Sequence, residues 1–165
     1  MDLTKMEIHT MTVSDLDEIK ENLSENFNNF WNYKIFKDEL VNNNSSYLVL
    51  RYDDEIVCYG GIKIIIDEAD VMNIVTRKDK RNMGFAKFIL NELINIAKEE
   101  NCKLITLEVN ENNLPAIHLY EKFDFKQVGL RKKYYDGIDN AILMTLELNW
   151  FFSIIYYFFV TPSSS

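Results

Sequence analysis

A cluster of basic side chains follows an apolar run in the first half of the chain. Residues 73–90 read NIVTRKDKRNMGFAKFIL, in which Gly84 separates a basic loop from an amphipathic segment. The cations of this stretch are Arg77, Lys78, Lys80, Arg81 and Lys87. A helix start offers unpaired N–H groups and the positive end of the helix dipole, and a glycine lets an anion come close. The stretch predicts a phosphate-binding loop, with a solvated surface turn as the alternative.

A glutamate near the end of an apolar segment is the second candidate for chemistry. Glu108 lies within LITLEV, residues 104–109. Apolar neighbours desolvate a carboxylate, which raises its pKa and makes it a better general base at neutral pH. The alternative is a side chain that points outward into water at a strand end.

Two polar side chains downstream share a predicted helix. Asn113 precedes this helix and Tyr120 lies about two helical turns later, so both can face one cleft. Asn113 can cap the helix or bind a ligand, and Tyr120 can pack or donate a proton. His118 has no second histidine or cysteine nearby, and we interpret it as a surface or packing residue.

The elements that must position these residues alternate between strands and helices. Periodicity and turn residues predict strands at 6–13, 47–52, 56–66, 70–75, 103–109, 125–131 and 141–147, and helices after Ser14 and at 33–41, 84–101 and 114–122. We expect Ser14 and Asp17 to form a capping box, and Asp53 and Asp54 to form a tight hairpin turn. The 103–109 segment is expected to be a central parallel strand buried on both faces.

Composition narrows the class of protein. A length of 165 residues suits one domain, and 26 acidic against 18 basic residues argues against nonspecific nucleic-acid binding. Cys58 and Cys102 stand apart without zinc-site spacing, so we expect no metal and a cytoplasmic protein with reduced thiols. The N-terminus has no signal-peptide pattern, and no transmembrane span is expected.

Two motifs carry a family resemblance. RNMGFA at 81–86 is similar to a Q/R-x-x-G-x-G/A pyrophosphate loop, and LEVNENNLPAIHLYEKFDF at 107–125 to an L-E-V, asparagine, L-Y-E pattern. With them the chain resembles the GNAT superfamily of acetyl-CoA-dependent N-acetyltransferases, within it the RimI-like ribosomal-protein alanine N-acetyltransferases. The resemblance implies a mixed α/β fold: a central sheet of about seven strands, about four helices, and a splay between strands four and five. It covers residues 6–148, and we expect a catalytic domain at 1–148.

The resemblance also implies a role for each matching residue. Glu108 would accept the proton of the amine, and Tyr120 would protonate the departing thiolate. Backbone groups at 74–76 would hold the pantetheine arm and the acetyl carbonyl, and 82–87 would wrap the pyrophosphate. The implied cofactor-binding residues are Ile74, Val75, Thr76, Arg81, Asn82, Met83, Gly84, Phe85, Ala86, Lys87 and Asn113.

Three positions depart from the family pattern. Ala86 replaces a second loop glycine, Lys78 a proline, and Asp124 a glycine before the closing phenylalanine. Aspartate tolerates a left-handed backbone better than most residues, so Asp124 can still end the helix.

The implied function is transfer of acetyl from acetyl-CoA to a primary amine, foremost the N-terminal α-amine of a ribosomal protein, by direct attack in a ternary complex. An α-amine with a pKa near 8 demands less of a base than lysine near 10.4. The alternatives are a small-molecule amine or lysine as acceptor, or a non-catalytic acetyl-CoA-binding regulatory domain. By position alone, Trp31, Tyr134 and Tyr135 are expected to face the acceptor.

An aromatic segment follows the resemblance. Residues 150–160 read WFFSIIYYFFV, with seven aromatics in eleven positions. The segment is too short to span a bilayer, and exposed apolar surface of this kind usually marks an interface. We expect 149–165 to be an extension that packs on the domain or joins a homodimer, with peripheral membrane contact as the alternative.

Overall fold

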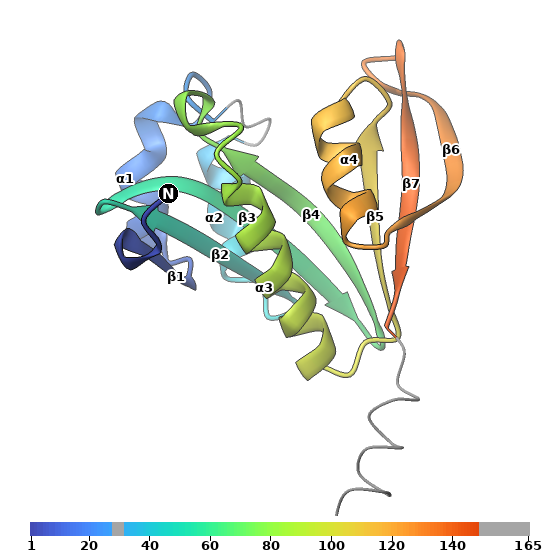
Figure 1. Cartoon of the computed structure of the whole chain (residues 1–165), viewed down its shortest axis with the longest axis horizontal. Coiled ribbons are helices and arrows are strands. Elements are labelled where there is room, and N and C mark those ends of the chain that lie inside the picture. The colour runs from blue at the N-terminus through green and yellow to red at the C-terminus, as the bar shows by residue number, and fades with distance from the viewer. Residues whose placement is uncertain (28–31, 149–165) are drawn as a thin grey trace, which may run out of the picture.

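The computed structural model describes residues 1–27 and 32–148. These residues form a seven-stranded sheet in the order β1-β2-β3-β4-β5-β7-β6, with helices on both faces (Figure 1). The strands are β1 (Met6–Thr10), β2 (Ser45–Tyr52), β3 (Glu55–Ile65), β4 (Glu68–Thr76), β5 (Leu104–Asn110), β6 (Lys126–Tyr135) and β7 (Asp139–Glu147). The helices are α1 (Val13–Ile19), α2 (Tyr33–Leu40), α3 (Phe85–Glu99) and α4 (Leu114–Lys122), with short 3-10 turns at η1 (Leu3–Lys5), η2 (Lys20–Asn22) and η3 (Lys78–Lys80). The expected order of elements and the mixed α/β class are confirmed.

The expected capping box forms two residues earlier than predicted. Thr12 caps α1: its hydroxyl accepts from the Asp15 N–H at 3.2 Å, and Asp15 Oδ2 accepts from the Thr12 N–H at 2.8 Å. Ser14 and Asp17 have the same spacing, so the local pattern could not separate the two pairs. A tertiary contact distinguishes the Thr12–Asp15 pair, because Arg51 of β2 donates to Asp15 at 3.0 Å.

Left-handed residues make the turns where the sequence predicts them. Asp53 and Asp54 join β2 to β3 with φ of 56° and 66°, as a two-residue hairpin with a primed turn requires. Asp124 follows α4 with φ of 65°, so it takes the place of the family's glycine as expected.

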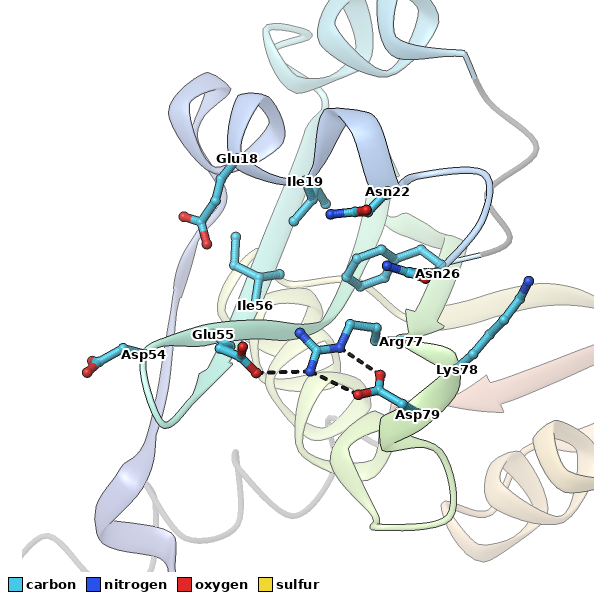
Figure 2. Close-up of a pocket in the computed structure, with 11 residues that line it drawn as sticks. Glu18, Ile19, Asn22, Asn26, Asp54, Glu55, Ile56, Arg77, Lys78 and Asp79 are labelled. Carbon is cyan, nitrogen blue, oxygen red and sulfur yellow. Dashed lines mark hydrogen bonds and ion pairs between the residues drawn. The ribbon is translucent and has the colours of Figure 1, made fainter.

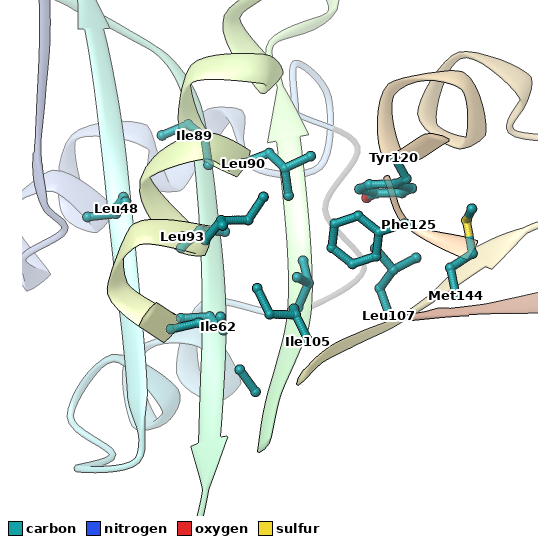
Figure 3. Close-up of a cluster of buried hydrophobic side chains, with 14 of the residues drawn as sticks. Leu48, Ile62, Ile89, Leu90, Leu93, Ile105, Leu107, Tyr120, Phe125 and Met144 are labelled. Carbon is teal, nitrogen blue, oxygen red and sulfur yellow. The ribbon is translucent and has the colours of Figure 1, made fainter. Parts of the chain in front are cut away.

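The sheet separates two hydrophobic clusters. On one face, α3 and α4 cover the first cluster, which includes Leu93 and Phe125 (Figure 3). On the other face, α1 and α2 pack against β2 and β3, with Phe36 and Tyr59 in ring contact at 5.2 Å. Both clusters anchor β4, whose residues therefore have a fixed backbone position.

The sheet divides between β4 and β5. The two strands pair in parallel at only three positions, from Glu68 with Leu104 to Asp70 with Thr106, and then diverge (Figure 1). A bulge in the β3–β4 pairing shifts the register near Gly61, which bends β4 at this point. The expected splay between strands four and five is thus confirmed, and we call this opening the fork.

One expectation about β5 is wrong. Its burial alternates: Ile105, Leu107 and Val109 are buried, whereas Thr106 and Glu108 are half-buried on the opposite face. Because α1 and α2 pack beside β2 and β3, the described residues give β5 a helix layer only on the face toward α4, and within them β5 is not buried on both faces. Glu108 is therefore half-buried and not part of the core.

The α1 cap predicts a pH-dependent stability. Burial opposes the charge of Asp15, but hydrogen bonds from Thr12 and Arg51 outweigh it and lower its pKa to about 2. The folded pKa lies below the unfolded value of 3.8, so this stabilisation is complete above about pH 4 and lost as pH falls toward 2. We expect Asp15→Asn to lower the unfolding free energy at pH 7 by roughly 1–2 kcal/mol, measured by urea unfolding.

Glu25→Gln, an exposed turn substitution, serves as the control for Asp15→Asn. The difference between wild type and Asp15→Asn should shrink between pH 4 and pH 2.5. A difference that stayed constant over this range would contradict the assignment.

Candidate active site

The fork exposes one edge of β4. On its other side β4 pairs with β3 as far as Thr76, opposite Cys58. Beyond Asp70, the backbone groups of β4 that face β5 have no partner in that strand. Residues 74–76, expected to hold the pantetheine arm, lie on this open edge. An extended amide chain entering the fork could therefore pair with β4 as an added strand would.

The loop after β4 leads directly into α3. Asn82 has φ of 61° and Gly84, the N-cap, has φ of 86°, so the backbone turns sharply before the helix. Among residues 1–27 and 32–148, no side chain caps α3 and no atom lies within 4 Å of where a Cβ at Gly84 would be. The first-turn N–H groups of a fifteen-residue helix thus border open space, which is the arrangement that a phosphate group requires.

The side chains of this loop divide into two groups. Arg81, Asn82, Met83 and Lys87 are exposed, whereas the side chain of Phe85 is 1% exposed and packs against Tyr52. Phe85 can therefore offer only its backbone to a ligand. Arg81 Nε donates to the Thr76 carbonyl at 3.3 Å, which links the loop to the end of β4.

Arg77 departs from the expected cluster of five phosphate-binding cations. Its guanidinium donates to Glu55 at 2.9 Å and to Asp79 at 2.7 Å (Figure 2). These ion pairs point it into a pocket of about 390 Å³ between η2 and η3, whose lining residues include neither Glu108 nor Tyr120. Two carboxylates already pair with Arg77, and Lys78 lines the same pocket, so both depart from the expected cluster of five.

Glu108 lies beside the fork on the face away from α4. Its carboxylate is part-buried, with the side chain 29% exposed. Arg131 Nη2 donates to Oε1 at 2.7 Å, whereas Oε2 is buried and has no hydrogen-bond partner among the described residues. Nearby, Thr106 donates to Asp70 at 3.0 Å, and desolvation followed by a smaller effect of Glu108 raises the pKa of Asp70. The side chain is therefore neither freely solvated nor fully paired.

Tyr120 reaches the fork from the other face. It is 9% exposed on α4, and its ring packs 5.7 Å from that of Phe125 (Figure 3). Burial raises the pKa of Tyr120 to about 12, with smaller contributions from Tyr135 and Cys58. The pKa of Tyr135 is raised by burial and then by the charge of Glu108. Tyr135 thus lies within electrostatic range of both proposed proton-transfer residues.

The structure describes Asn113, Tyr134 and Tyr135 among the remaining predicted site residues. Asn113 caps α4, where its Oδ1 accepts from the Ala116 N–H at 3.3 Å, as one of the two predicted roles requires. Tyr134 is 50% exposed and meets Tyr135 edge to face at 5.1 Å. Trp31 lies outside the described residues.

Two contacts that sequence reasoning missed join these parts. Arg131 pairs with Glu108 although 23 positions separate them in the chain. Lys78 N–H donates to the Asn26 carbonyl at 2.8 Å, which ties the basic loop to the segment after η2. Neither pair leaves a periodic signal in the sequence.

Comparison with known proteins identifies the family. The sequence pattern of the acetyltransferase (GNAT) family matches residues 14–125. The chain belongs to the acetyltransferase (GNAT) family. The family resemblance and the enzyme class expected from the sequence are thereby confirmed.

Individual relatives narrow the comparison for this acetyltransferase. A Bacillus subtilis protein named as a proposed ribosomal protein bS18-alanine N-acetyltransferase is 31% identical over 148 residues, covering 88% of this chain and 98% of that protein. The crystal structure of the ribosomal-protein-S18-alanine N-acetyltransferase from Escherichia coli aligns with a TM-score of 0.79 at 25% identity, over 87% of this chain and 94% of that one. Arabidopsis thaliana NAA60 in complex with acetyl-CoA shares the fold, with a TM-score of 0.77 at 17% identity over 87% and 99% of the two chains.

Two kinds of feature are absent from the described residues of this acetyltransferase. No helix among residues 1–27 and 32–148 is long and apolar enough to cross a membrane. In the same part of the chain, no group of three or more His, Cys, Asp or Glu side chains is placed to hold a metal ion.

Proposed function

We propose that this acetyltransferase transfers acetyl from acetyl-CoA to the N-terminal α-amine of a ribosomal protein. The observation that carries the proposal is the Glu108 carboxylate, which borders the fork with one oxygen buried and unpartnered. The names of the Bacillus and Escherichia relatives support the acceptor.

The open loop and strand edge fit the donor. Acetyl-CoA supplies the acetyl group as a thioester, and its pyrophosphate suits the uncapped start of α3 beside Gly84. Arg81 and Lys87 are exposed on this loop and would add positive charge. The free edge of β4 at residues 74–76 would hold the pantetheine amides and place N–H donors near the thioester carbonyl.

Proton transfer falls to the two residues that flank the fork. Glu108 would accept a proton from the acceptor ammonium, directly or through water, so that the free amine attacks the thioester carbon. Tyr120 would donate its proton to the departing sulfur, since its raised pKa of about 12 keeps the hydroxyl protonated. The attacking nitrogen then loses its extra proton to the Tyr120 phenolate, so the products are the neutral amide and the free thiol. Acetyl passes directly to the amine, and no residue of the chain forms a covalent bond to it.

Acceptor choice is tested with a panel of amines. The purified chain is incubated with acetyl-CoA and a peptide matching the start of ribosomal protein bS18, beside the same peptide with a blocked α-amine, a lysine peptide and spermidine. We expect the free α-amine to be acetylated at least roughly tenfold faster than the others, because its pKa near 8 leaves more free amine at pH 7.5 than lysine. Mass spectrometry locates the acetyl group, and faster transfer to lysine or spermidine would contradict the proposed acceptor.

Three expectations remain predictions. The domain boundary near residue 148 and a cytoplasmic location are proposed here on the sequence and the family. The homodimer through residues 150–160 falls outside the described residues, as does the alternative of membrane contact.

A further inference from the structure

One carboxylate oxygen of Glu108 accepts a hydrogen bond from Arg131, and the other has no hydrogen-bond partner among the described residues. Arg131 lies on β6, and its side chain spans β7 to reach Oε1 on β5 at 2.7 Å. Oε2 is buried and unpartnered among the described residues. We propose that Arg131 is a positioning residue that fixes the Glu108 carboxylate so that Oε2 faces the acceptor amine. This inference rests on the proposed function, because it assigns Arg131 a role only through Glu108.

A distortion in β6 follows Arg131. The β6–β7 register steps from Arg131 opposite Ala141 to Tyr135 opposite Asp139, so three β6 residues stand against one in β7. Within this bulge Lys133 has φ of 52°, a conformation that costs a lysine free energy. Bulges next to active sites commonly redirect a side chain. The distortion therefore begins at the residue that contacts the base.

The bulge is fastened to the end of β5. Lys133 N–H donates to Asn140 Oδ1 at 3.0 Å, and Asn140 Nδ2 donates to Glu111 Oε2 at 2.9 Å. The Asn140 N–H also donates to Glu111 Oε1 at 3.0 Å. Because Glu111 directly follows β5, these bonds hold β6 at a set distance from the strand that carries Glu108.

Arg131 has a second partner, the ring of Tyr134. Its guanidinium lies 5.0 Å from the ring centroid of Tyr134, within range of a cation–π contact. The planar guanidinium is thus restrained by a carboxylate and a ring, which limits its rotation. The Arg131 side chain is 54% exposed, and ion pairs this exposed contribute little to stability. Replacing Arg131 should therefore lower kcat and leave the thermal unfolding midpoint nearly unchanged.

A double-mutant cycle tests the inference. We expect Arg131→Met to lower kcat roughly 10- to 100-fold, because a misplaced base loses its alignment, without changing KM for acetyl-CoA. Arg131→Lys should fall between Met and wild type, since an ammonium restores the charge but not the planar geometry. Arg131→Met in a Glu108→Gln background should cost less than twofold further, because Arg131 has no base left to position. Lys126→Ala, an exposed substitution at the start of β6 and outside the bulge, is the matched control and should keep the wild-type kcat.

Several results would overturn the inference. If Arg131→Met had the wild-type kcat while Glu108→Gln was slow, Glu108 would remain the base and Arg131 would not position it. Equal losses from Arg131→Met in the wild-type and Glu108→Gln backgrounds would show that Arg131 acts independently of Glu108. A thermal unfolding midpoint lowered in parallel with the rate would assign Arg131 to the fold. Wild type that acetylates no amine, or Glu108→Gln that is as fast as wild type, would overturn the proposed function or base and this inference with it.

Discussion

Glu108→Gln is expected to lower kcat at pH 7 by roughly 10²- to 10³-fold and to leave the affinity for acetyl-CoA unchanged. Glutamine keeps the size of the side chain and an oxygen toward Arg131, but it cannot take a proton. The loss should shrink at pH 9.5, where an α-amine with a pKa near 8 is already deprotonated and needs no base. Initial rates from pH 6.5 to 9.5 measure the effect, and calorimetric titration measures binding of acetyl-CoA.

A second carboxylate provides the control for Glu108→Gln. Glu121 is exposed on α4, and Glu121→Gln should retain the wild-type rate at every pH. If Glu108→Gln matched Glu121→Gln at pH 7, Glu108 would not be the base. An equally large loss at pH 9.5 would instead indicate a defect in acceptor binding.

Tyr120→Phe has the next largest expected effect, a fall in kcat of roughly 10- to 100-fold with stability nearly unchanged. Phenylalanine keeps the ring that packs on Phe125 and removes only the hydroxyl, the proposed proton donor. The native hydroxyl has a pKa raised by burial to about 12, so it stays protonated through pH 10. The wild-type kcat profile should therefore show no decline from Tyr120 between pH 7 and pH 10.

Tyr52→Phe on β2 is a matched control, because its ring packs on Phe85 away from the fork. It should keep the wild-type kcat under the same conditions. An unchanged kcat in Tyr120→Phe would show that the thiolate leaves without this donor. A wild-type decline below pH 10 that Tyr120→Phe abolished would contradict the raised pKa.

Much of this protein could be predicted from the sequence because the signals are local. Hydrophobic periodicity, turn residues and Gly84 each act through neighbours within a few positions, so α4 was predicted with its observed bounds of Leu114–Lys122. The family motifs are also local, and Glu108 and Tyr120 both lie in one of them, residues 107–125.

The tertiary structure decided what depends on distant residues. By local spacing alone, Thr12 and Ser14 are equivalent caps, and the contact of Arg51 with Asp15 distinguishes them. The apolar composition of β5 is compatible with burial on both faces, but in the fold its burial alternates and only one face is buried. The same reason explains the most consequential contact in the site. The insertion of β7 between β5 and β6 brings Arg131 to Glu108, and no interaction between chain neighbours encodes that strand order. The sequence by itself determined which residues could do the chemistry, and only the folded sheet decided which oxygen of the Glu108 carboxylate pairs with Arg131 and which has no hydrogen-bond partner among the described residues.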